Sequence, residues 1–279
     1  MELYTKTSYE ISRTLTLRYS TSFGKSTKLF PKTMQPHIFA IYGLVRVADE
    51  IVDTYTGDHQ EALLDELEQD AYRALKVQYS ANPLVHAFAV TAKQFNIDDS
   101  LIQPFFRSMR LDLAPRTYTQ KLYEEYIYGS AEVIGLMCLK VFVHGDESAY
   151  ARLSPGASAL GAAYQKVNFL RDIASDYYDR GRMYFPEIKF ETFDEAQKRA
   201  VVADIEADFL AAESSIRDLP KSSRAAVGLS HAYYLELLKK LKATPIETIK
   251  KSRIRVPAGK KAALGLRHSL NIQKGTRIW

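Results

Sequence analysis

Apolar residues recur along this chain at spacings close to 3.6 residues, the period of an α-helix, while strand-like alternation is scarce. Pro and Gly residues separate the periodic stretches. The pattern predicts an all-α fold, with helices over 2–19, 34–55, 60–79, 83–95, 102–111, 121–143, 149–178, 192–215, 222–242 and 260–271. The breaks are short and no internal repeat is present, so we expect residues 1–279 to form a single domain.

Two of these helices are apolar on nearly all sides and yet end in paired aspartates, Asp49 with Asp53 and Asp172 with Asp176. Residues four apart lie on one face of a helix, and a helix that is apolar all round is normally buried. A buried carboxylate needs a cation, a metal ion or hydrogen bonds as partner. Two such pairs facing one cavity would form a hard-cation site. Oxygen-only ligands favour Mg²⁺, with Mn²⁺ as the alternative.

Further polar residues accompany the aspartates. Gln165 and Asn168 extend the second pair into a polar stripe on an otherwise apolar helix, which indicates that the stripe lines an internal cavity. Arg46 lies three residues before the first pair, and Arg171 directly precedes the second. Guanidinium groups are suited to paired contacts with phosphate oxygens, so this arrangement favours a phosphate-bearing ligand.

Departure of diphosphate from an allylic substrate is a reaction that needs these groups together. Metal ions with arginine and lysine neutralise the charge of the leaving diphosphate. The carbocation left behind requires a dry apolar pocket, and aromatic faces stabilise it. The 18 tyrosines and 13 phenylalanines of the chain supply such rings in quantity, although their number alone does not identify the chemistry.

Composition places the chain among ordinary globular proteins, with 46% hydrophobic and 25% charged residues. The single cysteine, Cys138, excludes an internal disulfide and suits a reducing cytoplasm. The first 20 residues lack the order of a secretory signal, and no apolar run is expected to reach the length of a membrane span, so no transmembrane anchor is expected. The net charge of +5 permits an anionic ligand or an acidic membrane surface but does not indicate nucleic acid.

Several ordered segments resemble one known family. They are 19–23 (Tyr-Ser-Thr-Ser-Phe), 41–53 with the first acidic pair, 109–113, 126–135, 165–176 with Gln-x-x-Asn-x-x-Arg-Asp, and 181–186 (Gly-Arg-Met-Tyr-Phe-Pro). Either acidic pair alone is a weak signal, whereas all segments in this order are a specific one. Along nearly its full length the chain resembles the squalene/phytoene synthase family of head-to-head prenyl diphosphate synthases.

The resemblance implies an isoprenoid synthase-type helical domain with a central cavity and prenyl diphosphate substrates. Tyr42, Tyr126 and Phe23 would line the cavity near the reacting carbons. By the same resemblance the metal ligands are Asp49, Asp53, Asp172 and Asp176, the substrate-binding residues are Ser20, Thr21, Ser22, Gln165, Asn168, Arg171, Tyr234, Arg253 and Arg255, and the catalytic residues are Arg46, Tyr42, Tyr126 and Phe23.

Segments 109–113 and 126–137 look most like those of bacterial phytoene synthases. This likeness implies condensation of two geranylgeranyl diphosphates through a cyclopropyl diphosphate, without NADPH, as the first step of carotenoid biosynthesis. Squalene, hydroxysqualene or dehydrosqualene formation from farnesyl diphosphate is the alternative. The chain departs from the family at Ser175, where many members carry Glu, at Thr21, where some carry a basic residue, and at Glu132, where a small residue is frequent.

Structural explanations of the same residues stay open at this point. Arg46 could simply pair with Asp49 or Glu50, and the tyrosines could be core residues with satisfied hydroxyls. The basic residues around Arg253 and Arg255 are consistent with a solvated surface or with peripheral contact to the inner membrane face. Three other classes of protein remain: a helical scaffold that binds divalent cations for stability, a basic nucleic-acid-binding domain, and a head-to-tail chain-elongating synthase.

Overall fold

Helices make up the chain almost throughout in the computed structural model, which describes residues 2–20, 24, 26–114 and 117–265. Within these residues the one β feature is an isolated bridge between Thr117 and Met183. The elements are α1 (Glu2–Tyr19), α3 (Gln35–Asp53), α4 (Gln60–Val77), α5 (Pro83–Gln94), α6 (Asp99–Leu111), α7 (Gln120–Ile127), η1 (Tyr128–Glu132), α8 (Val133–Val143), α9 (Glu147–Arg180), α10 (Glu195–Asp218), α11 (Lys221–Ala243) and α12 (Ile246–Ile249). The all-α prediction is confirmed.

Capping residues account for the boundaries that the sequence pattern misplaced. The helix expected at 102 begins at Asp99, because the Asp98 side chain caps it by accepting from the Ser100 N–H at 3.0 Å. The helix expected at 192 begins only after Asp194, which forms a capping box with Gln197. The last predicted helix is present from 258 to 265, and its remaining residues lie outside the described part of the chain.

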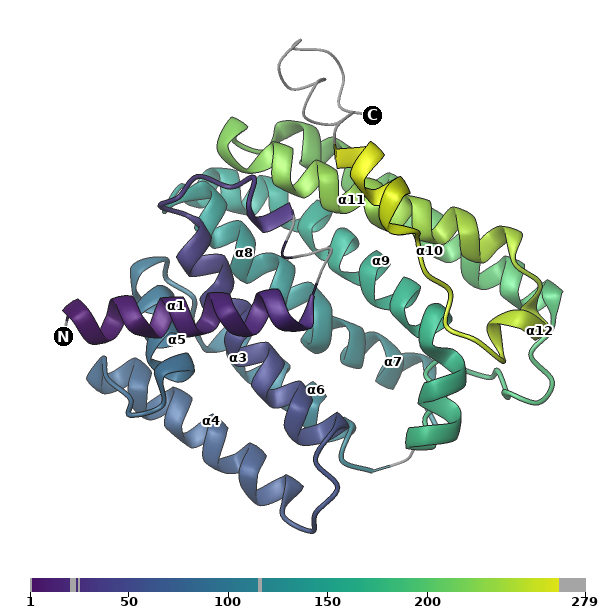
Figure 1. Cartoon of the computed structure of the whole chain (residues 1–279), viewed down its shortest axis with the longest axis horizontal. Coiled ribbons are helices and arrows are strands. Elements are labelled where there is room, and N and C mark those ends of the chain that lie inside the picture. The colour runs from purple at the N-terminus through teal and green to yellow at the C-terminus, as the bar shows by residue number, and fades with distance from the viewer. Residues whose placement is uncertain (1, 21–23, 25, 115–116, 266–279) are drawn as a thin grey trace.

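Helix α9 runs through the middle of the protein, between α8 and α10, while α1 lies across α3 and α5 (Figure 1). One cluster of buried apolar residues joins α3 to α4, α5, α6 and α8 and includes Phe88 and Phe106. A second cluster joins α7, α9, α10 and α11 and includes Phe169 and Phe209. The two apolar helices with acidic ends, α3 and α9, therefore belong to different parts of the core, and their polar ends meet between those parts.

A π-helix interrupts the predicted helix 121–143. In this segment Gly129 lies so close to α6 that an added Cβ would stand 2.1 Å from the Pro104 carbonyl oxygen and 2.1 Å from Ser108 Oγ. A π turn disturbs the regular backbone hydrogen bonds, and Ser108 Oγ donates to the Tyr126 carbonyl at 3.2 Å. Glycine is required here by this close approach, which the apolar pattern could not show.

One helical run has the length and hydropathy of a membrane span, which the sequence prediction had excluded. It is Gln120–Val143, and the most apolar 18-residue window of this run has a mean hydropathy of 1.5. That prediction is wrong as to length and composition. Half of the most apolar window, 50%, is buried inside the protein, and α9 packs against both η1 and α8. Buried core helices pass the same test of length and hydropathy, so among the described residues this run is weak support for a membrane span.

Because His231 is buried, we expect the free energy of unfolding to fall in acid. It is 1% exposed on α11, and its ring meets the Phe209 ring edge at 5.4 Å. Burial lowers the pKa of His231 to about 4 from an ordinary 6.5. The folded state therefore favours the neutral ring, and its stabilising contribution is complete above pH 6.5 and lost as the pH falls toward 4. By linkage the loss approaches about 3 kcal/mol.

We expect the free energy of unfolding of His231→Gln to vary less with pH between 6.5 and 4 than that of the wild type, as measured by urea titrations at several pH values. His59→Gln, at an exposed position, is the matched control and should leave the pH dependence unchanged. Equal slopes for the wild type and His231→Gln would contradict the assignment.

Candidate functional site

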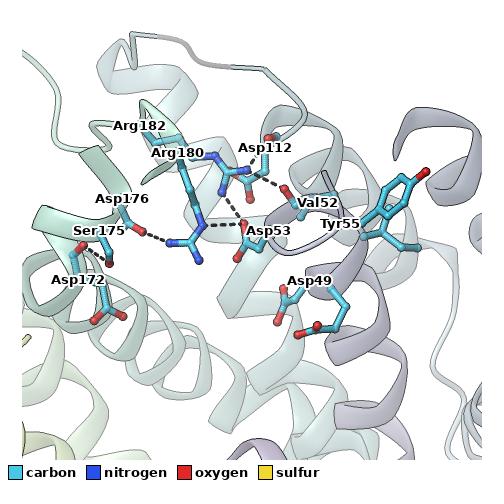
Figure 2. Close-up of polar contacts among 12 residues, drawn as sticks. Asp49, Val52, Asp53, Tyr55, Asp112, Asp172, Ser175, Asp176, Arg180 and Arg182 are labelled. Atoms are coloured by element: carbon cyan, nitrogen blue, oxygen red, sulfur yellow. Dashed lines mark hydrogen bonds and ion pairs between the residues drawn. The ribbon is translucent and has the colours of Figure 1, made fainter. Parts of the chain in front are cut away.

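The structure brings the two acidic pairs to one site. Arg180 joins them, since its Nη1 lies 3.0 Å from Asp176 Oδ1 and its Nε lies 3.6 Å from Asp53 Oδ1 (Figure 2). Asp53 ends α3 and Asp176 lies in the last turns of α9, so the contact closes the gap between the two halves of the core. The sequence predicted that the pairs face one another, and it did not predict the arginine between them.

Each remaining aspartate of the pairs also has an arginine partner. Asp172 receives Arg171, with Nε 2.9 Å from Oδ1, and Arg253, with Nε likewise 2.9 Å from Oδ1. Asp49 is paired less closely, with Arg46 Nη2 at 3.7 Å. The predicted substrate-binding arginines Arg171 and Arg253 therefore do lie at the acidic site, although half of the Arg253 side chain, 51%, is exposed.

Arg46 serves several partners at once. Its Nη2 lies 3.0 Å from Glu50 Oε1, and its guanidinium lies over the Tyr19 ring, 4.9 Å from the centroid. The ion-pair explanation of Arg46 is thus correct for this structure. It does not remove the residue from the site, because Asp49 and Tyr42 lie beside the same side chain.

Burial raises the pKa of two of the four aspartates to about 7. For Asp49 the neighbouring Asp53 adds to the effect of burial, and Arg46 opposes it. For Asp176 the neighbouring Asp172 adds to burial, and Arg180 opposes it. The arginines therefore compensate these carboxylates only in part, and an additional cation near them would stabilise their ionised forms.

A divalent metal ion fits this donor set. The available donors are carboxylate oxygens, which suit Mg²⁺ and Mn²⁺, and two of these groups lack full charge compensation. In the arrangement seen here no group of three or more His, Cys, Asp or Glu side chains among the described residues converges on a single point. The carboxylates are turned toward arginines instead, so holding a metal ion requires that some of these ion pairs open.

The C-terminal turn of α9 places two arginines at the site. Gly181 adopts φ of +65°, a left-handed conformation that favours glycine, and the Arg182 N–H donates to the Asp176 carbonyl at 2.8 Å. This turn lets Arg180 project from the end of the helix, while Arg182 directs its side chain toward α3. The Gly-Arg of segment 181–186 is therefore a structural part of the acidic site.

Arg182 forms a buried network that sequence reasoning missed. Its Nη1 lies 2.5 Å from Asp53 Oδ1, and its Nη2 donates to the carbonyls of Val52 at 3.1 Å and Asp112 at 2.5 Å (Figure 2). Burial disfavours the charged guanidinium, but Asp112 and Asp53 outweigh this and raise the pKa of Arg182. Both segments, 109–113 and 181–186, were noticed in the sequence, but their spacing could not reveal that they meet.

Asp112 is the centre of this network. The hydroxyls of Tyr126 and Tyr184 donate to its two oxygens at 2.6 Å and 3.0 Å. Burial raises the pKa of Asp112 to about 6, although Arg182 and the Tyr126 hydroxyl favour the carboxylate. Tyr126 was predicted to line the cavity. It is 3% exposed and is not among the cavity residues, because its hydroxyl is directed to Asp112 instead.

An apolar cavity of about 270 Å³ lies beside the acidic site. Tyr42 from α3 and Gln165 from α9 line the end nearer the aspartates. Leu153 and Phe142 line the other end, and the α9 lining alone covers roughly 18 Å of helix axis. Of the polar stripe predicted to line a cavity, only Gln165 does so, and Asn168, Asp172 and Asp176 lie beyond this end of the space. Glu132 is not a lining residue, since it interacts with Ser158 and Lys166.

The remaining predicted substrate-binding and catalytic residues differ in how close they lie to the cavity. Tyr234 stacks on Tyr164 with centroids 3.9 Å apart, and its hydroxyl donates to Asn168 Oδ1 at 3.5 Å, beside the cavity. Ser20 lies half-buried just after α1. The Arg255 side chain is exposed, and its carbonyl accepts from Lys240 at 2.7 Å. Thr21, Ser22 and Phe23 lie outside the described residues.

Comparison with known proteins shows which family the chain is similar to. Residues 16–260 match the family described as squalene/phytoene synthase. A 15-cis-phytoene synthase of Synechococcus elongatus is 30% identical over 284 residues, which cover 91% of this chain and 89% of that protein. The chloroplastic phytoene synthase 3 of Zea mays is 31% identical over 269 residues, which cover 87% of this chain and 61% of the maize protein. The chain thus spans less than two thirds of the maize relative.

Solved structures share the helical arrangement. A dehydrosqualene synthase in complex with ligand has a TM-score of 0.81 at 20% identity, covering 97% of this chain and 98% of that one. A squalene synthase of Alicyclobacillus acidocaldarius has a TM-score of 0.74 at 21% identity, covering 90% of this chain and 97% of that one. At these identities the likeness concerns the fold, and it confirms the isoprenoid synthase-type architecture.

The network around Asp112 predicts a large loss of stability when its acceptor oxygens are removed. Asp112→Leu leaves the Tyr126 and Tyr184 hydroxyls without their acceptor and Arg182 without one of its carboxylates. We expect the free energy of unfolding to fall by about 3 to 5 kcal/mol, as is usual when one member of a buried charged network is deleted. Urea denaturation measures this change. Asp112→Asn, which keeps an acceptor oxygen, should lose less, and equal stability of the wild type and Asp112→Leu would contradict the prediction.

Proposed function

The chain belongs to the squalene/phytoene synthase family, and on that premise we propose that it is a prenyltransferase that condenses two geranylgeranyl diphosphates head to head into phytoene. One observation carries the proposal: the acidic ends of α3 and α9 meet beyond one end of a long apolar cavity, where Asp49 and Asp172 each follow a cavity-lining residue, Tyr42 or Gln165, by about two helical turns. Such a site accommodates a diphosphate head at the carboxylates and a hydrocarbon tail in the cavity.

The acidic site is proposed to bind the diphosphates with a metal ion. Asp49, Asp53, Asp172 and Asp176 would hold Mg²⁺, or Mn²⁺ in its place. When bound, this ion neutralises the charge that develops on the departing diphosphate. The chain adds its own cations, since Arg171 and Arg253 lie beside the second pair and Arg46 lies beside the first, where their guanidinium groups can contact phosphate oxygens.

The cavity is proposed to control the carbocation chemistry. The C1–O bond of one substrate breaks, C1 bonds to the C2=C3 double bond of the other, and loss of a proton closes a cyclopropane. The second diphosphate then leaves, the ring opens, and loss of another proton gives the product. Aliphatic and small side chains such as Leu160, Ala157 and Ile134 line the space and exclude water. Tyr42 faces it near the polar end, where its ring can stabilise positive charge.

The remaining features of the proposal follow from the reaction. Because both halves end in loss of a proton, we propose that NADPH takes no part. Because the product is a hydrocarbon, we propose a cytoplasmic protein in peripheral contact with the inner membrane face, where the exposed Arg253, Arg255 and Lys251 offer positive charge to anionic lipid. We propose that residues 1–279 act as one catalytic domain.

The direct test is incubation of the purified chain with Mg²⁺ and either geranylgeranyl or farnesyl diphosphate, with and without NADPH, followed by mass analysis of the extracted lipid. A forty-carbon product that does not depend on NADPH is expected. A thirty-carbon product would keep the reaction class and replace the substrate, and no product from either substrate would contradict the proposal.

Single substitutions Asp49→Ala, Asp53→Ala, Asp172→Ala and Asp176→Ala should each abolish turnover, because each removes an oxygen ligand that the chain supplies. Circular dichroism should show a largely unchanged helical content, since each carboxylate stands at the end of its helix. Asp218→Ala, in an exposed ion pair on α10, is the matched control and should retain activity. A variant of the four with near-normal turnover would exclude that aspartate from the metal site.

A larger side chain inside the cavity should shift chain-length preference. Ala157 lines the cavity on α9, between Gln165 and Leu153. Ala157→Phe shortens the usable space, so we expect the ratio of kcat/KM for the twenty-carbon substrate to that for the fifteen-carbon substrate to fall at least about tenfold, the effect of roughly 1.4 kcal/mol in transition-state binding. An unchanged ratio would show that the tails do not reach this position.

A further inference from the structure

Arg180 stands between carboxylates that belong to two different helices. Its contacts are to Asp176 on α9, at 3.0 Å, and to Asp53 at the end of α3, at 3.6 Å (Figure 2). Among the contacts of the described residues, its guanidinium reaches only these two carboxylates, and Nε is buried without a hydrogen-bond acceptor. A singly charged group thus occupies the space between one member of each acidic pair.

The neighbouring Arg182 is bound differently. It is 6% exposed and donates to two backbone carbonyls, those of Val52 and Asp112, in addition to its carboxylate contacts. Moving it would leave those buried carbonyls unsatisfied, which is unfavourable. Arg180 has no such backbone bonds among the described residues, and 30% of its side chain is exposed, so its departure breaks ion pairs alone.

We propose that Arg180 is a resident cation, which keeps Asp53 and Asp176 together in the metal-free protein and is displaced when a divalent metal ion binds. The inference rests on the proposed function, in which these two aspartates are metal ligands. A guanidinium within hydrogen-bond distance of a carboxylate that also binds a doubly charged ion would be repelled by that ion. Arg180 is the last residue of α9 and is followed by Gly181, which adopts a positive φ of 65°, so the Arg180 side chain can turn outward while the Asp176 backbone stays in place.

This arrangement couples metal affinity to Arg180. While the arginine is in place, the acidic pairs stay close without metal, because their mutual repulsion is compensated. The metal must compete with the guanidinium for the same oxygens, so the concentration needed for loading is higher than the carboxylates alone would require. Arg180 therefore acts as a positioning residue that sets the metal concentration at which the site is filled.

The test compares Arg180→Gln and Arg180→Lys with the wild type by measuring Tm against MgCl₂ concentration and Mn²⁺ binding by electron paramagnetic resonance. Without metal, Arg180→Gln should have a lower Tm than the wild type. Its half-saturating Mg²⁺ concentration should fall by about tenfold, because the guanidinium no longer competes for the same oxygens. Arg180→Lys, which keeps the charge but offers a single point of contact, should fall between them.

The matched control is Arg152→Gln, which removes the same charge from the same helix at an exposed ion pair with Asp218. It should leave half-saturation unchanged. An unchanged or raised half-saturating concentration in Arg180→Gln, with metal binding intact in the wild type, would overturn the proposal for Arg180 alone. Failure of the wild type to bind either metal would overturn the metal role of the aspartates, and the displacement with it. If Arg180→Gln does not fold, the Arg180→Lys titration decides.

Discussion

Four partly buried carboxylates toward the ends of two apolar helices are the constraint on which the rest of this structure depends. An apolar helix is stable only inside the protein, and a charged group inside the protein is stable only with a partner. The chain meets both conditions by surrounding these aspartates with arginines from α3, from α9, from the turn after α9 and from the segment after α12. The compensation is incomplete, as the raised pKa values of Asp49 and Asp176 indicate.

The arginines around the aspartates fall into a buried structural one and more accessible ones. Arg182 binds backbone carbonyls as well as Asp53 and Asp112, so it joins the end of α3, the end of α6 and the turn after α9 into one buried unit. Arg180 and Arg253 bind side-chain carboxylates in more accessible positions. A single left-handed glycine, Gly181, separates the buried arginine from the accessible one. Local backbone geometry thereby determines which cation is fixed and which can exchange.

The sequence carried the fold class, the acidic pairs and the family, because helical periodicity and short ordered motifs are local properties. It did not carry the meeting of Asp112 with Arg182, since 70 residues separate them and only the packed helices bring them together. The π turn at Gly129 was also invisible, because α- and π-helical segments share similar apolar patterns. Tyr126 was predicted to line the cavity, but its hydroxyl donates to Asp112, a tertiary contact that the local sequence pattern could not show.

The continuous length of α9 has a consequence for how such a protein can diversify. One uninterrupted helix of 34 residues carries the far wall of the cavity at Leu153, its polar end at Gln165 and the aspartates at Asp172 and Asp176. A substitution that tilts this helix to accept a longer substrate tail also moves Asp172 and Asp176, the residues proposed to bind the diphosphate. Related proteins that accept substrates with longer or shorter tails must therefore acquire compensating changes near the aspartates. Chain-length selection and the position of the diphosphate site are thus coupled through one helix.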